Sequence, residues 1–167
     1  MLNLLARLRV PLGFGCAGVA LALARPSVTS LTIGLLFAVP GEALRIWAAG
    51  HIDKGREITR SGPYRYVRHP LYLGSTALGV GFAAATRSWL VCVLAALYLG
   101  VTLVAAIRSE EATLDAAFAG AYSAYREGRA EPVERRFTWS RVVRNREYRA
   151  VLGALIAFGW LAWWATR

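Results

Sequence analysis

The sequence predicts an all-α integral membrane protein: a helical bundle of about five transmembrane helices with a cytoplasmic amphipathic helix. Hydrophobic residues make up 56% of the 167-residue chain and charged residues only 18%. Soluble globular chains are about 45–50% apolar and about 25% charged. The apolar residues gather in five long runs, and the charges lie mainly in the linkers between them. A chain of this length fits a single membrane-embedded domain spanning residues 1–167.

Each apolar run is a candidate span, because a helix needs about 20 residues to cross the hydrocarbon core of a bilayer. Three runs, 28–49, 89–107 and 150–166, contain 22, 19 and 17 residues and predict spans directly. The runs 10–24 and 71–85 contain 15 residues each. These two cross only if flanking residues extend the helix or the bilayer thins locally.

The basic residues predict how these spans are oriented. The net charge is +10, and five spans place 16 Lys and Arg on the side of the N-terminus but only three on the other side. This bias predicts a bacterial-type inner or plasma membrane protein whose N-terminus and basic linkers are cytoplasmic. Alternatively, the first run with Ala22-Leu23-Ala24 is a cleaved secretory signal. Cleavage would leave four spans and the same linkers inside.

Several common site types have no sequence support. Cys16 and Cys92 stand alone in apolar runs, where we expect small buried side chains. There is no metal-ligand spacing, no P-loop, and Gly79-Val80-Gly81 lacks the third glycine of a dinucleotide-binding motif. We therefore expect no metal site. The high apolar content argues against a nucleic-acid partner, and no obligate protein partner is evident.

The linker before the third run reads GPYRYVRHPLYLG from Gly62. Gly62-Pro63 predicts a turn, and Pro70 fits the first turn of the next helix. Arg68 and His69 then stand at the start of that helix, where they suit a carboxylate or a nucleotide-like head group. A basic collar with an aromatic belt is the alternative. The two prolines, two glycines and three tyrosines of this stretch favour a site.

An acidic pair, Glu110 and Glu111, follows the fourth run. Adjacent carboxylates repel each other unless a positive group binds them, so they are candidates for binding a cation, a ribose or an amine. Beyond them, apolar and aromatic residues recur at helical spacing from Leu114 to Tyr125. This periodicity predicts an amphipathic helix lying over the bundle.

Inside the second run, Glu42 and Arg45 lie three residues apart and share a helix face. A charged side chain within a span is energetically costly unless it is ion-paired or hydrated. Because such charges are rarely kept without a role, these two residues are functional candidates. The alternative is an internal ion pair, with Arg45 reaching the interface. We expect Glu42 to be structural, and both interpretations stay open for Arg45.

Together these motifs resemble the isoprenylcysteine carboxyl methyltransferase family, which is related to the phospholipid N-methyltransferases. The resemblance covers residues 40–126 and rests on the GPYRYVRHPLYLG linker, the acidic pair with Leu114 and Phe118, and Tyr122-x-x-Tyr125. The stretch GEALRIWA from Gly41 also resembles bacterial members. Where the family often has Phe-Gly-x-Glu-Tyr, this chain has FAGAY, with the glycine displaced and the acid absent.

The resemblance implies an S-adenosylmethionine-dependent enzyme that methylates a lipid-like or prenylated substrate at the cytoplasmic face. The activity it matches best is isoprenylcysteine carboxyl O-methylation. The implied cofactor contacts are Tyr64, His69, Pro70, Tyr72, Glu110 and Glu111. The chemistry of Arg68 adds it to this set, as a partner for the cofactor's carboxylate or base. Arg45 and Arg108 are the candidate catalytic cations that would orient a carboxylate substrate.

Three other functions compete with this one. Phospholipid N-methylation uses the same motifs but needs a proton acceptor for the amine, for which His51, His69 or a glutamate is available. An NADPH-dependent sterol or enone reductase shares a related helical arrangement but is usually much longer. A non-enzymatic bundle binding anionic lipid heads leaves Glu110 and Glu111 unexplained.

Overall fold

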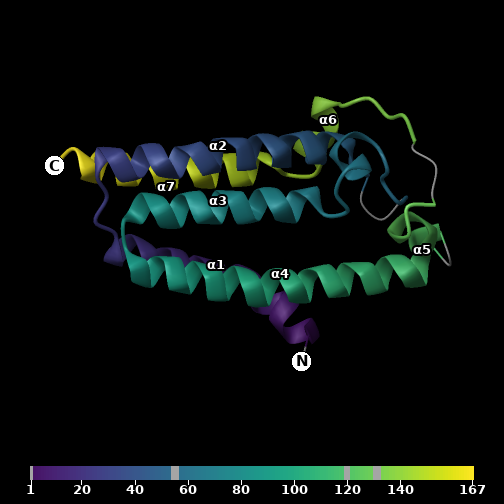
Figure 1. Ribbon diagram of the computed structural model, residues 1–167, viewed down its shortest axis with the longest axis horizontal. Helices are drawn as coiled ribbons and strands as arrows, with labels where there is room; N and C mark the ends of the chain where they lie inside the picture. The colour runs from purple at the N-terminus through teal and green to yellow at the C-terminus, as the bar shows by residue number, and fades with distance from the viewer. Residues whose placement is uncertain (1, 54–56, 119–120, 130–132) are drawn as a thin grey trace.

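The computed structural model describes residues 2–53, 57–118, 121–129 and 133–167, and all regular structure in these ranges is helical (Figure 1). This confirms the all-α prediction. The five long helices are α1 (Leu2–Leu23), α2 (Val28–His51), α3 (Pro70–Thr86), α4 (Trp89–Ala117) and α7 (Tyr148–Ala165). The short elements are a 3₁₀ turn, η1 (Gly62–Arg65), and the helices α5 (Ala121–Arg126) and α6 (Trp139–Arg144).

Three of the helices, α2, α4 and α7, have the length and apolar composition needed to cross a membrane. They coincide with the three longest apolar runs of the sequence, and the chain is an integral membrane protein. Their outer faces carry large apolar side chains, such as Leu36 at 69% and Ile156 at 73% exposure. The two shorter runs also form helices of the bundle, α1 and α3. Whether these two cross the membrane stays a prediction.

Two basic linkers join α2 to α3 and α4 to α7. Their described parts lie at one end of the bundle (Figure 1). There α2 and α4 end, α3 and α7 begin, and η1, α5 and α6 are found. At the opposite end lie the connections from α1 to α2 and from α3 to α4, together with the C-terminus. The ends of α2, α3, α4 and α7 thus alternate between the two ends of the bundle, whereas α1 begins below its middle (Figure 1). The assignment of the basic end to the cytoplasm remains a prediction from charge.

Helices α2 and α3 form the most extensive helix pair because small residues face each other along them. A Cβ added to Gly34 would lie 2.5 Å from the Gly81 carbonyl oxygen, and one on Gly41 would lie 2.9 Å from that of Gly74. Small residues let membrane helices approach closely in this way. The same approach brings Arg45 over α3, since a Cβ on Gly74 would lie 2.6 Å from Arg45 Cγ.

The segment before α7 caps the end of α2. Asn145 Nδ2 donates hydrogen bonds to the carbonyls of Ala49 at 2.9 Å and Ile52 at 3.2 Å. Arg141 Nη1 donates to the Gly50 carbonyl at 3.0 Å. These are the last carbonyls of a helix or just beyond it, which lack intrahelical partners. The capping holds the start of α7 beside the end of α2.

The amphipathic helix predicted from Leu114 to Tyr125 is wrong as a single element. Helix α4 gives way at Phe118, whose φ of −123° and ψ of 32° are not helical, and Tyr122 belongs to the separate helix α5. The sequence periodicity does not show this break, because the aromatic side chains of α5 also point inward; Tyr122, for example, is only 1% exposed. Periodicity reports which side chains are buried, not whether the backbone between them is continuous.

Candidate functional site

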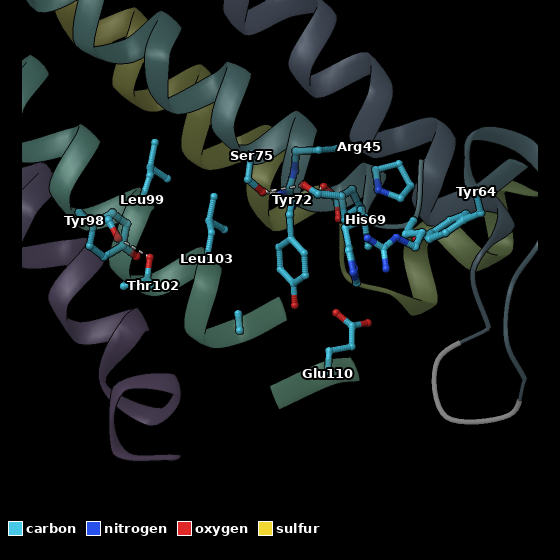
Figure 2. Close-up of a pocket in the computed structure, with 15 residues that line it drawn as sticks. Arg45, Tyr64, His69, Tyr72, Ser75, Tyr98, Leu99, Thr102, Leu103 and Glu110 are labelled. Atoms are coloured by element: carbon cyan, nitrogen blue, oxygen red, sulfur yellow. Dashed lines mark hydrogen bonds and ion pairs between the residues drawn. The ribbon is translucent and has the colours of Figure 1, made fainter. Parts of the chain in front are cut away.

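A cavity of about 350 Å³ opens at the basic end of the bundle, among η1, α2, α3, α4 and the start of α7. In Figure 2, His69, Glu110 and Tyr64 lie on one side, which we call the polar half, and Leu99 and Leu103 lie on the other side, with Tyr98 and Thr102. Arg45 and Ser75 lie between these two halves. Its volume is within the range of about 300–1,000 Å³ usual for small-molecule sites.

The turn before α3 positions the polar half. Gly62 has a φ of +56°, and an added Cβ would lie 2.5 Å from the ring of His51, so glycine is required there. The 3₁₀ turn that follows buries Tyr64. As predicted, Pro70 begins the next helix, which leaves His69 at the N-cap position.

A cluster of four side chains joins this turn to α4 and α5. His69 Nε2 lies 3.0 Å from Glu111 Oε1, and the Tyr122 hydroxyl donates to the same oxygen at 3.0 Å. Arg68 Nη1 approaches it to 3.4 Å. Burial and the neighbouring Glu111 raise the pKa of Tyr122 well above its usual value, so the hydroxyl stays protonated and donates.

Tyr64 brings a buried hydroxyl to the cavity wall. This hydroxyl has no hydrogen-bond partner among the described residues, although a buried polar group normally has one. Burial and then the nearby Glu110 raise the pKa of Tyr64, so the hydroxyl is neutral and available as a donor. The Tyr64 carbonyl accepts a hydrogen bond of 2.8 Å from the Tyr125 hydroxyl. Glu110 lines the same cavity, with its carboxylate toward the hydroxyl of Tyr72 (Figure 2).

Arg45 is held by three side chains between the two halves of the cavity. Its Nη2 lies 2.6 Å from Glu147 Oε1, its Nη1 donates to Ser75, and its Nε lies 3.8 Å from Glu42. Both interpretations of Arg45 therefore have a basis, since it is ion-paired and also lines the cavity. Sequence reasoning missed Glu147; its only signal was that it is a lone acid in a basic stretch next to an apolar run.

The structure brings most of the predicted site residues together. Six line the cavity: Tyr64, Arg68, His69, Pro70, Tyr72 and Glu110. Glu111 adjoins it through His69. Of the two predicted cations, Arg45 lines the cavity and Arg108 is exposed and outside its lining. His51 is buried elsewhere, with Nδ1 3.1 Å from Ser61 Oγ. The roles assigned to all these residues stay predictions.

An apolar groove of about 540 Å³ between α3 and α4 adjoins this cavity, since Leu99 and Leu103 line both. Cys92 lies in this groove and is exposed, so the expectation that it is buried is wrong. In a membrane helix an apolar side chain is as well placed against lipid as inside the protein, so apolarity does not predict burial. Among the described residues, no group of three or more His, Cys, Asp or Glu could hold a metal ion.

Comparison with known proteins relates this site to a family of methyltransferases. Residues 42–121 match the sequence model of the phospholipid methyltransferase family. The match covers just under half of the chain, and it includes every predicted site residue.

Two curated relatives are each similar to just over half of the chain. The nickel-cobalt-cadmium resistance protein NccN of Alcaligenes xylosoxydans xylosoxydans is 35% identical over 94 residues, which is 55% of this chain and 44% of that protein. The cobalt-zinc-cadmium resistance protein CzcN of Cupriavidus metallidurans is 36% identical over 90 residues, 53% of this chain and 42% of that protein. The similarity thus spans less than half of each relative. No solved structure matches the chain significantly.

Proposed function

We propose that this protein is a membrane-embedded methyltransferase that binds S-adenosylmethionine in the cavity and methylates the polar end of a lipid-like or prenylated acceptor. One observation carries the proposal: the motif residues meet around one cavity, and an apolar groove adjoins that cavity at Leu99 and Leu103. The match to the phospholipid methyltransferase family supports the same reaction type.

The residues of the polar half fit this cofactor chemically. Carboxylates such as Glu110 suit its amine or its ribose hydroxyls, whereas Arg68 and His69 suit its carboxylate or its base. The unpartnered Tyr64 hydroxyl would gain an acceptor. Glu111 holds the turn that carries Arg68 and His69, so its contribution is to position them.

When bound, the cofactor supplies an electrophilic methyl group; the acceptor's lone pair bonds to its carbon as the carbon–sulfur pair leaves with sulfur. The chain's own contribution is alignment, because fixing two reactants in line is worth about 7–11 kcal/mol. The groove lined by Leu99 and Leu103 would hold the acceptor's tail and present its head to the cavity.

Two acceptors fit this reaction. Resemblance to the isoprenylcysteine carboxyl methyltransferases favours a prenylcysteine carboxylate at the cytoplasmic face. The family match favours the amine of a phospholipid. Incubating membrane lipid extract with a methyl-labelled cofactor separates them, because label in a carboxyl ester is released by base and label on nitrogen is retained.

Binding measurements test the proposal itself. We expect purified protein in detergent to bind S-adenosylmethionine and its demethylated product, and His69→Ala and Glu111→Ala to weaken both. Glu127→Gln, at an exposed ion pair with Arg129, is the matched control and should bind normally. Binding of NADPH, and of neither S-adenosylmethionine nor its demethylated product, would favour the reductase alternative. If neither S-adenosylmethionine nor its demethylated product binds, the proposal is wrong.

A further inference from the structure

We infer that Glu147 determines acceptor specificity: by pairing with Arg45 where the polar cavity meets the apolar groove, it favours a neutral or cationic head group over an anionic one. The inference rests on the proposed function. Glu147 lies outside the matched residues 42–121 and reaches the cavity from the start of α7. It acts through Arg45 and is therefore a positioning residue.

Each of the three nitrogens of the Arg45 guanidinium lies near a protein oxygen, so a ligand anion would compete with groups that are already in place. Two of its nitrogens contact Glu147 and Ser75, and the third is 3.8 Å from Glu42. The Glu147 side chain is 7% exposed and that of Arg45 is 18% exposed. A carboxylate so close and so shielded from water neutralises the guanidinium far more effectively than a surface partner would.

The pair lies where the acceptor's head group would be. Leu99 and Leu103 line both the groove and the cavity, so an acceptor whose chain lies in the groove would present its head group to the cavity at these residues. In Figure 2, Ser75 lies between Leu103 and Tyr72, and Arg45 reaches toward Ser75. The head group would therefore meet the Arg45–Glu147 pair as it approaches the cofactor position.

The charge at this point disfavours an anion. Arg45 is accompanied by two carboxylates, Glu42 and Glu147, and Glu110 lies across the cavity. The other cation of the lining, Arg68, contacts Glu111. Both arginines of the lining are thus already ion-paired. An anionic head group would lose its water shell here without gaining an unpaired cation, which is costly, whereas a neutral group or an amine beside Glu110 and Glu147 avoids this cost.

The fixed position of Glu147 follows from the capping of α2. Asn145 and Arg141 bind the carbonyls at the end of α2 from the residues just before Glu147. The caps hold the backbone at residue 147 beside α2, and the Glu147 carboxylate is then within 2.6 Å of Arg45 Nη2. We therefore expect the pair to persist when a ligand binds, rather than to open and release Arg45 for an anion.

Two single-chain probes test the inference: dodecylamine, a cation at neutral pH, and dodecanoate, an anion, titrated calorimetrically in non-ionic detergent. We expect the wild-type protein to bind dodecylamine more tightly. Glu147→Gln keeps the shape but leaves the Arg45 charge unbalanced, and should shift the affinity ratio toward dodecanoate by about tenfold, equivalent to about 1.4 kcal/mol. The double variant Arg45→Gln/Glu147→Gln should return the ratio toward the wild-type value. Glu127→Gln, a surface change of equal charge, should leave it unaltered.

Several outcomes would overturn the inference. One is a wild-type preference for dodecanoate. Another is a Glu147→Gln ratio that moves no further than that of Glu127→Gln. Equal weakening of both probes would reveal a merely structural role. If Glu147→Gln does not fold, the test uses the wild-type protein and the charge-conserving variant Glu147→Asp. Both should prefer dodecylamine, and a preference for dodecanoate in either would overturn the inference. The proposed function fails separately, on the absence of S-adenosylmethionine binding, whereas this inference fails on the head-group ratio alone.

Discussion

His69 Nε2 lies 3.0 Å from Glu111 Oε1, although the two residues are 42 positions apart in the chain. This contact joins the C-terminal part of α4 to the start of α3, and the Tyr122 hydroxyl reaches the same oxygen from α5. The two adjacent acids, Glu110 and Glu111, therefore have different surroundings. Glu111 is directed at protein groups, whereas Glu110 lines the cavity.

Substituting the two acids separately should therefore give different results. Glu111→Gln weakens contacts to His69, Tyr122 and Arg68, and we expect it to cost about 1–3 kcal/mol of stability and to weaken binding of the demethylated cofactor. Glu110→Gln should weaken the same binding with little effect on stability. Thermal unfolding and calorimetric titration in detergent measure the two effects. Equal losses of stability in both variants would contradict this difference between the two acids.

Because the pKa of Tyr122 is raised in the folded protein, we expect the protein to lose stability in alkali. Above the ordinary tyrosine value of about 10, the unfolded chain loses a proton that the folded one keeps. The contribution of Tyr122 to the free energy of unfolding should thus be constant below about pH 10 and fall above it. Tyr122→Phe should lose about 0.5–1.5 kcal/mol at neutral pH and show a shallower decline between about pH 10 and pH 11. A decline as steep as that of the wild type would refute this role.

Features that depend on local chemistry could be predicted from the sequence. Pro70 begins a helix because its ring suits the first turn and needs no donor. The three longest apolar runs became the three helices able to span a membrane, since length and composition determine that property directly. Glu147 could not be predicted as a site residue, because its contact with Arg45 arises only when α7 packs beside α2. The break at Phe118 and the exposure of Cys92 were missed because periodicity and apolarity do not report backbone continuity or a lipid-facing position.

Tyr64→Phe should separate ligand binding from stability. Its hydroxyl is buried without a partner among the described residues, so removing it relieves an unsatisfied polar group and should leave the protein equally or slightly more stable. If the hydroxyl serves the ligand, binding of S-adenosylmethionine should weaken by about tenfold. Tyr66→Phe, whose side chain is exposed at 79%, is the matched control. Unchanged binding in Tyr64→Phe would remove Tyr64 from the cofactor site.

Packing of α2 on α3 should be intolerant of even one methyl group. A Cβ on Gly41 would lie 2.9 Å from the Gly74 carbonyl and from Leu78 N, so Gly41→Ala should cost about 1–3 kcal/mol through overpacking. In α7, a Cβ on Gly153 would meet nothing within 4 Å. Gly153→Ala should therefore be neutral or stabilising by up to about 1 kcal/mol. Equal effects of both substitutions on thermal unfolding would show that the close helix contact does not limit stability.

Filling the groove should act on the acceptor and spare the cofactor. Gly100 lines the groove, and a Cβ there would meet nothing within 4 Å, so the ring of Gly100→Phe can extend into the space proposed for the acyl chain. We expect dodecylamine binding to weaken by about tenfold or more, with binding of butylamine and of the demethylated cofactor unchanged. Gly153→Phe, on the lipid-facing side of α7, controls for an added ring in the membrane. If Gly100→Phe binds dodecylamine as well as this control does, the acceptor's chain does not occupy the groove between α3 and α4.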